Sequence, residues 1–189
     1  MESMAAIRSE VARSDLAALL DYVIGASHDG TISRLHNTLR ISQKTVAWLD
    51  VIEFAIHRLG HRSWRYREGR RDVWVLESSI RLPELKSVTT SFIRGFFDAE
   101  GGTPQAIDAR FYIQLVQKNG PLLADIRRGL VARGIRCGVL HNPSVRVDPN
   151  YWRFFVRASS WSDFATTIGS WHPRKRAIFD RRFKLRPGR

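Results

Sequence analysis

The sequence predicts an α+β protein made of two similar halves, each with the element order αββαββ and the second followed by one more helix. A glycine-containing helix that ends in an acid and a glycine occurs twice, and each copy precedes a strand, an amphipathic helix and a strand pair. The strand after each copy ends in the same dipeptide, Gln43-Lys44 and Gln117-Lys118. We therefore expect two pseudo-symmetric repeats, each a curved antiparallel sheet covered by helices.

The first half opens on an apolar helix for which Ser14 or Asp15 is available as the N-cap. The strand that follows alternates, with Leu39 and Ile41 directed to the core. Leucine and isoleucine then recur at helical spacing and predict a second helix. The expected elements are a helix at 15–30, a strand at 38–44, a helix ending at Gly60, and strands at 61–68 and 72–79.

The second half repeats this order after a linker at 81–90. Ser160, with Asp163 three residues later, predicts a capping box that opens the final helix. The expected elements are a helix within 92–102, a strand at 111–118, a helix ending at Gly134, strands at 136–141 and 151–158, and a final helix bearing Trp161, Phe164, Ile168 and Trp171.

The helix in the middle of the chain has an unusual end. Gly95 and Ala99 share one face and allow another backbone to approach closely. The glycines at 101–102 predict a left-handed stop. Asp98 and Glu100 lie in the last turn, where the helix dipole is already negative. We therefore expect a compensating positive charge, such as a divalent cation, at this end.

The nine residues Ile93-Arg94-Gly95-Phe96-Phe97-Asp98-Ala99-Glu100-Gly101 resemble the motif of the LAGLIDADG homing endonucleases. In that family the penultimate acid of the motif, here Glu100, binds metal and is catalytic. The first helix resembles a weaker copy in which Asp29 precedes Gly30, although Gly25 lies five residues before Gly30 whereas Gly95 lies six before Gly101. The resemblance covers roughly residues 15–176 and implies a two-motif, monomeric protein joined through paired motif helices that pack at Gly25, Gly95 and Ala99.

Composition agrees with a nucleic-acid partner. The 189 residues are 43% hydrophobic, which is enough for a core, and 31 Lys and Arg against 18 Asp and Glu give a net charge of +13. No run of about eighteen apolar residues occurs, which argues against a membrane partner. The single cysteine, Cys137, excludes an internal disulfide and a cysteine-rich zinc site, and favours the cytoplasm, or an organellar matrix in a eukaryotic host.

The resemblance implies a site-specific endonuclease that cuts both strands of duplex DNA. Asp29 and Glu100 would hold Mg²⁺, for which Mn²⁺ could substitute, and each acid would serve one strand. Gln43 and Gln117 match the polar strand-end residues that hold the attacking water in the family. Lys175 is the candidate for the basic residue that completes the pocket.

DNA contacts are expected on the outward faces of the strands, where arginine reads guanine and glutamine reads adenine. The segment 173–189 carries eight Lys or Arg and one acid, and is expected to be a basic tail that tracks phosphates or lacks order without DNA. The candidate DNA-binding residues are Arg40, Ser42, Lys44, Arg65, Arg67, Tyr112, Gln114, Lys118, Arg153 and Arg157.

Four units follow from this: an N-terminal repeat at 15–80, a linker at 81–90, a C-terminal repeat at 91–172 and the basic tail. The alternative function is a non-cleaving DNA-binding regulator, or a maturase that binds intron RNA, on the same fold. Retention of both Asp29 and Glu100 favours cleavage, because a pure binder has no reason to keep acids beneath phosphates. A third interpretation is an unrelated basic RNA-binding protein, and the internal repeat argues against it.

Overall fold

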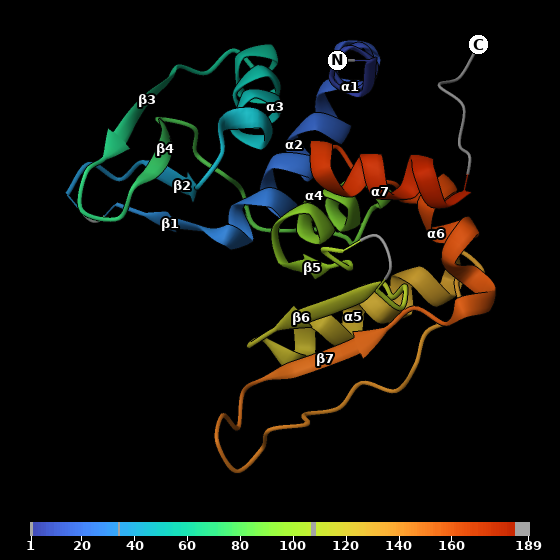
Figure 1. Cartoon of the computed structure of the whole chain (residues 1–189). Coiled ribbons are helices and arrows are strands. Elements are labelled where there is room, and N and C mark those ends of the chain that lie inside the picture. The colour runs from blue at the N-terminus through green and yellow to red at the C-terminus, as the bar shows by residue number, and fades with distance from the viewer. Residues whose placement is uncertain (1, 34, 107–108, 184–189) are drawn as a thin grey trace.

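The computed structural model describes residues 2–33, 35–106 and 109–183. Two helices, α2 and α4, lie side by side at the centre, and each half builds a sheet outward from this pair (Figure 1). The elements of the first half are α1 (Glu2–Arg13), α2 (Leu16–Ala26), the 3₁₀ turn η1 (Ser27–Asp29), β1 (Gly30–Ile32), β2 (Leu39–Gln43), α3 (Val46–Arg58), β3 (Ser63–Glu68) and β4 (Val73–Ser78).

The second half continues into two further helices beyond its sheet. Its elements are α4 (Thr90–Glu100), β5 (Gly101–Gly102), β6 (Gln114–Gln117), α5 (Gly120–Ala132), β7 (Trp152–Phe155), the 3₁₀ turn η2 (Ala158–Ser160), α6 (Trp161–Thr167) and α7 (Pro173–Phe183).

The first three strands of each sheet follow the same order, and this confirms the predicted two-repeat α+β fold. The first has the strand order β1-β2-β4-β3 and the second β5-β6-β7, all neighbours being antiparallel. The expected strand at 136–141 does not form a regular ladder. It contributes only two isolated bridges, Cys137 to Val156 and His141 to Arg153, in the place that β3 occupies in the first sheet.

The α2–α4 contact depends on two glycines. A Cβ on Gly95 would lie 2.0 Å from the Tyr22 carbonyl oxygen, and one on Gly25 would lie 2.2 Å from the Phe92 carbonyl oxygen. Each glycine thus faces the backbone of the other helix. The pair of glycines lets the two helices approach more closely than any side chain would allow.

The 3₁₀ turn accounts for the shorter spacing in the first motif. α2 ends at Ala26 and η1 covers the next three residues, whereas α4 stays α-helical as far as Glu100. A 3₁₀ helix rises about 2.0 Å per residue against about 1.5 Å in an α-helix, so three 3₁₀ residues advance the chain about as far as four α-helical ones. Asp29 and Glu100 therefore reach similar positions along their helices.

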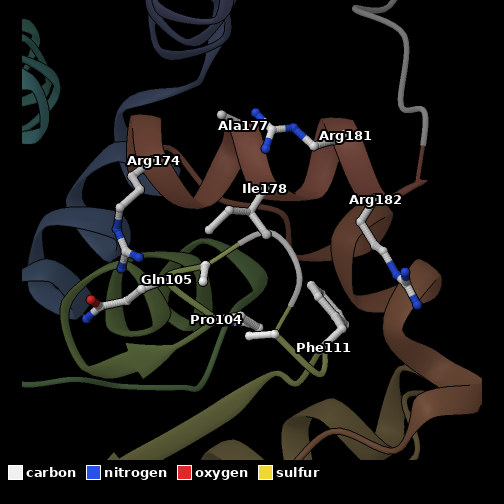
Figure 2. A pocket seen from close by; sticks show the side chains of 10 residues that line it. Pro104, Gln105, Phe111, Arg174, Ala177, Ile178, Arg181 and Arg182 are labelled. Atoms are coloured by element: carbon white, nitrogen blue, oxygen red, sulfur yellow. The ribbon is translucent and has the colours of Figure 1, made fainter.

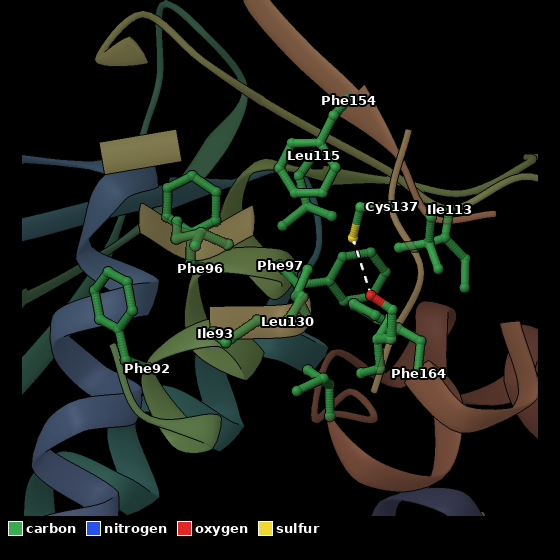
Figure 3. Close-up of a cluster of buried hydrophobic side chains, with 14 of the residues drawn as sticks. Phe92, Ile93, Phe96, Phe97, Ile113, Leu115, Leu130, Cys137, Phe154 and Phe164 are labelled. Atoms are coloured by element: carbon green, nitrogen blue, oxygen red, sulfur yellow. Dashed lines mark hydrogen bonds between the residues drawn. The ribbon is translucent and has the colours of Figure 1, made fainter. Parts of the chain in front are cut away.

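Each half has its own core, and the cores meet at α2 and α4. In the second half, Phe96 and Phe97 of α4 pack with Leu115 of β6 and Phe154 of β7 (Figure 3). In the first half, α2 and α3 pack on Ile41 and Leu76 of the sheet. Helices α3 and α5 end as predicted, each just before a glycine in the left-handed conformation: Gly60 and Gly134 both have φ of +79°.

Several local expectations are wrong. The glycines at 101–102 do not form a left-handed stop: Gly101 is extended, with φ −79° and ψ 142°, and a Cβ there would strike the Phe97 ring at 2.1 Å. Ser160 does not cap α6, because its hydroxyl accepts a hydrogen bond from the Arg136 amide instead. Helix α1, which buries Ile7 and Val11, was not predicted.

The C-terminal segment also differs from expectation. α6 ends at Thr167, and Gly169, with φ of +64°, turns the chain so that Trp171 leaves the helix. The Trp171 ring instead enters the core of the first half, 4.5 Å from the Tyr22 ring. Residues 173–183 of the expected tail form α7, with Lys175 and Phe179 buried, and the rest of the tail lies outside the described residues.

Within the described ranges, the structure contains no helix that combines the length and the apolar character needed to cross a lipid bilayer.

Candidate active site and nucleic-acid interface

Asp29 and Glu100 lie at the ends of the two central helices, each immediately before the glycine that begins a strand. Asp29 closes η1 ahead of β1, and Glu100 closes α4 ahead of β5. Asp29 is exposed and Glu100 is half-buried, so both can meet a ligand from outside. The η1 turn that carries Asp29 packs against α4, which carries Glu100, so the two acids lie at adjoining chain positions. Burial raises the pKa of Glu100, and the charge of Asp29 adds to the rise.

Gln43 and Gln117 occupy equivalent positions beside these acids. Gly30 pairs with Ile41 and Gly101 pairs with Leu115, so each glutamine lies two residues beyond the partner of a motif glycine. The Gln43 amide donates a hydrogen bond to Asp29. The Gln117 side chain lies near enough to Glu100 to oppose the rise in the pKa of that carboxyl. The Gln117 carbonyl also accepts from the Lys118 amide at 2.7 Å. Each acid therefore has a glutamine beside it at the end of the neighbouring strand, and the Gln43 amide bonds directly to Asp29.

Both carboxyl groups hold their protons more tightly than free acids do. Loss of hydration raises the pKa of Asp29 to about 6, while Lys175 and the Gln43 hydrogen bond oppose the rise. Loss of hydration, followed by repulsion from Asp29, raises the pKa of Glu100, opposed by Lys175 and Gln117. Asp29 keeps one side open to solvent, so the surrounding protein desolvates it only in part. A cation bound between these acids would relieve the repulsion.

Lys175 supplies the positive charge that the end of α4 was expected to need. Its side chain is only 3% exposed, and its ammonium donates to the carbonyl oxygens of Phe97 at 2.5 Å and Asp98 at 2.9 Å. Burial lowers the pKa of Lys175 to about 8, while the charges of Asp98, Asp29 and Glu100 oppose the decrease. The helix dipole is therefore compensated by the chain itself, from a position beneath the two acids.

Asp98 anchors the segment that leads into α7. Its buried carboxylate accepts hydrogen bonds from the Tyr22 hydroxyl at 2.9 Å and from the amides of Trp171 at 2.8 Å and His172 at 3.0 Å. The Ser170 hydroxyl donates to the second carboxylate oxygen. Burial raises the pKa of Asp98, and Lys175 together with these donors opposes the rise. Asp98 thus holds the start of α7 where Lys175 can reach the end of α4.

The oxygen donors at the two helix ends fit a small, hard divalent cation. Two carboxylates are available, and the described residues contain no cluster of three or more His, Cys, Asp or Glu side chains arranged to hold a metal. Mg²⁺ is commonly bound by one or two carboxylates, with water and substrate phosphate oxygens completing its shell. Asp29 and Glu100 would hold such an ion.

The open face of the first sheet carries only part of the predicted DNA-binding set. Arg40 and Ser42 lie on it, and Lys44 follows the end of β2 in an exposed position. Arg65 lies on the other face, since it pairs directly with the buried Leu76. Its guanidinium binds Asp50 at 2.5 Å and also Glu53, both on α3. The expected outward placement of Arg65 is therefore wrong, because these acids hold it between sheet and helix.

Arg67 shares the face of Arg65, as its pairing with Trp74 shows, although it lies at the exposed end of the strand and forms an ion pair with Asp72. The open face instead presents Trp64 and Tyr66, which are not among the candidate DNA-binding residues. The signal was the alternation of β3 itself, Ser-Trp-Arg-Tyr-Arg-Glu, which places aromatics on one face and arginines on the other. The arginines of β3 therefore lie on the opposite face from the one expected.

The second sheet presents its predicted residues more fully. Gln114 and Arg153 lie on the face opposite the buried Leu115 and Phe154. Tyr112 precedes β6 in the same alternation, with its ring 6.2 Å from that of Phe155. Lys118 and Arg157 follow β6 and β7 and are exposed. Arg157 also donates to the Cys137 carbonyl at 3.4 Å.

One cavity lies apart from the acids. It has a volume of about 490 Å³ and lies between α7 and the segment after β5, with Phe111 and Ile178 on its walls (Figure 2). Three arginines, Arg174, Arg181 and Arg182, line it from α7. Neither carboxylate lines this cavity, so the candidate active site is the surface between the helix ends.

Replacing Asp29 by asparagine is expected to stabilise the metal-free protein at pH 7 but not at pH 4. The pKa of this carboxyl is higher in the folded chain, about 6, than its ordinary value of 3.8, so its contribution to stability falls as pH rises between these values. Thermal unfolding of wild type and Asp29→Asn at both pH values, in EDTA, measures this. An equal difference in Tm at the two pH values would contradict the assignment.

Solved structures of other proteins share the fold of this chain. No family model and no curated protein matches the sequence. The homing endonuclease I-DmoI in complex with DNA and Mn superposes with a TM-score of 0.62 at 18% identity, covering 82% of this chain and 98% of that one. Full-length DUF199/WhiA from Thermatoga maritima superposes with a TM-score of 0.68 at 14% identity, covering 97% and 67%. The N-terminal LAGLIDADG domain of DUF199/WhiA gives a TM-score of 0.64 at 15% identity, covering 86% and 90%. Two sheets built on paired motif helices, together with these superpositions, identify the chain as having the LAGLIDADG fold.

Proposed function

We propose that the protein is a site-specific, metal-dependent DNA endonuclease that cuts both strands of a long target, as homing endonucleases do. The observation that supports this proposal is that Asp29 and Glu100 each end a motif segment at the contact of η1 with α4, and each has a glutamine at the equivalent strand position. A protein that only binds DNA gains nothing from two repelling acids beside phosphates. The net charge of +13 supports DNA as the partner.

The residues of the site divide the chemistry between them. A divalent cation, Mg²⁺ or Mn²⁺, would neutralise charge on the scissile phosphate and activate water. Asp29 and Glu100 would hold it, one acid serving each strand. Gln43 and Gln117 would fix the carboxylates and orient water through their amides. Lys175 would keep the end of α4, and with it Glu100, in place from below.

The DNA would lie across the open faces of the two sheets. Arg40, Ser42 and Lys44 would contact one half of the target. The contacts to the other half would come from Tyr112, Gln114, Lys118, Arg153 and Arg157. Since both half-sites are covered by one chain, a monomer is sufficient.

The test is a selection followed by a cleavage assay. Duplexes bound by the wild-type protein are selected in EDTA from a random pool and cloned into a plasmid, which is then incubated with Mg²⁺ or Mn²⁺. We expect a metal-dependent double-strand break within the selected sequence. Binding without cleavage under either ion would contradict the endonuclease proposal.

A second candidate is a non-cleaving DNA-binding regulator or an RNA maturase. The observation that favours it is the superposition with full-length WhiA, which covers 97% of this chain and belongs to a protein not described as an endonuclease. Selection from an RNA pool run in parallel distinguishes the maturase. Preferential binding of RNA, with no cleavage of DNA, would support that function.

A further inference from the structure

A buried carboxylate lies on the open face of the first sheet and organises three neighbouring side chains. Glu77 of β4 is only 6% exposed. One of its oxygens accepts a hydrogen bond from the Thr38 hydroxyl, and the other accepts from the Tyr66 hydroxyl at 3.1 Å. The acid is therefore fixed in place, although nothing in the candidate active site requires it.

Arg40 is held against this carboxylate by one edge of its guanidinium. Its Nη2 donates to the Tyr66 hydroxyl at 2.6 Å, and its Nε lies 3.7 Å from the Glu77 carboxylate. The Tyr66 ring lies under the guanidinium at 5.8 Å. The structure gives Nη1 no hydrogen-bond partner among the described residues, and the Arg40 side chain remains 32% exposed. The outer edge, formed by Nη1 and Nη2, is thus free to bind a ligand.

We propose that Arg40 reads a guanine in the major groove of the target, and that Tyr66 and Glu77 are positioning residues for it. An arginine that presents two parallel donors matches the O6 and N7 acceptors of guanine. Holding the inner edge in advance reduces the side-chain entropy lost on binding. The inference rests on the proposed function, because it requires DNA on the open faces.

The place of Arg40 in the sheet favours a base over a phosphate. It lies on β2, which has a neighbouring strand on each side, opposite Thr31 of β1 and Glu77 of β4. A side chain in the middle of the sheet faces the floor of a groove, whereas phosphates lie along its rims. In the second sheet Gln114 takes the equivalent position, opposite Gly102 of β5. The two half-sites should therefore differ at this position, since glutamine does not share the preference of arginine for guanine.

The experiment compares base preferences of variants rather than their activity. Duplexes bound by the wild type, Arg40→Ala, Tyr66→Phe and Glu77→Gln are selected in EDTA from one random pool and sequenced. We expect one strongly preferred guanine in the wild-type site. The Arg40→Ala variant should lose that preference alone, with an affinity for the guanine duplex about tenfold or more lower. Tyr66→Phe and Glu77→Gln should weaken the same preference while Arg40 is still present.

Arg128→Ala is the control, because Arg128 is also an ion-paired arginine that solvent reaches, but it lies on α5, away from the open faces. It should leave every base preference unchanged. If Arg40→Ala weakens binding equally for all sequences, Arg40 contacts a phosphate and the inference is wrong. If the wild type selects no duplex at all, the proposed function fails and this inference fails with it.

Discussion

Replacing Gly95 by alanine should cost the protein about 3 kcal/mol or more of folding free energy, because the added methyl group has no space. Its Cβ would lie 2.0 Å from the Tyr22 carbonyl oxygen and 2.9 Å from the Ala26 amide nitrogen. Both atoms belong to the backbone of α2, so they cannot move aside as a side chain would. Thermal unfolding should show a Tm about 6–12 °C lower, and DNA cleavage should be impaired because the helix ends carry the acids.

Gly129→Ala provides the control for this prediction. Gly129 is also helical, but the nearest atoms to a Cβ there belong to the side chains of Val88, at 3.2 Å, and Arg133, at 3.3 Å. Those side chains can adjust, and alanine favours a helix over glycine by about 1 kcal/mol. This variant should be as stable as the wild type or slightly more stable. A Gly95→Ala variant that unfolded at the same temperature as Gly129→Ala would show that the helices do not meet closely at these glycines.

Loss of either acid should reduce cleavage of the strand it serves by about a thousandfold or more, because a bound metal supplies several kcal/mol at the transition state. Asp29→Asn and Glu100→Gln should each convert the double-strand break into a nick, and the double variant should cut neither strand. Binding of the target should persist or become slightly tighter, because each substitution removes a negative charge beside phosphates. Supercoiled plasmid carrying the selected site separates nicked from linear product.

Asp72→Asn serves as the control for the acid variants. Asp72 is an exposed acid in the turn before β4, paired with Arg67, and its φ of +50° is one that asparagine also adopts. It should cut both strands at the wild-type rate. Two single variants that both retained the full double-strand break would remove Asp29 and Glu100 from the chemistry.

The sequence predicted the fold because its main signals are local or periodic. The apolar spacing of α3 and α5, the glycines that end them, and the alternation of Leu39 and Ile41 depend only on neighbouring residues. The glutamines predicted at the two strand ends occupy equivalent positions in the structure, because both strands pair with a motif glycine in the same register. From these signals the sequence predicted that each acid ends a motif helix and has a glutamine beside it at the end of the next strand.

The errors arose where distant residues decide the outcome. Arg65 faces α3 because Asp50 and Glu53 offer it partners there, and alternation alone cannot tell the phase of a strand with polar residues on both faces. Lys175 was singled out, but its contact with the end of α4 depends on Asp98 anchoring the residues before α7. Trp171 continues the helical spacing of Trp161, Phe164 and Ile168, although α6 ends before it. Gly169 is the one local sign of that earlier end.

The most direct test of the central claim, that Asp29 and Glu100 meet at the helix ends to hold a divalent cation against DNA, is anomalous scattering from Mn²⁺. Crystals of the protein with its selected duplex, grown with Mn²⁺, should show an anomalous peak in direct contact with both carboxylates and with a phosphate of the DNA. A peak bound elsewhere, or carboxylates that face away from each other and from the duplex, would contradict the account.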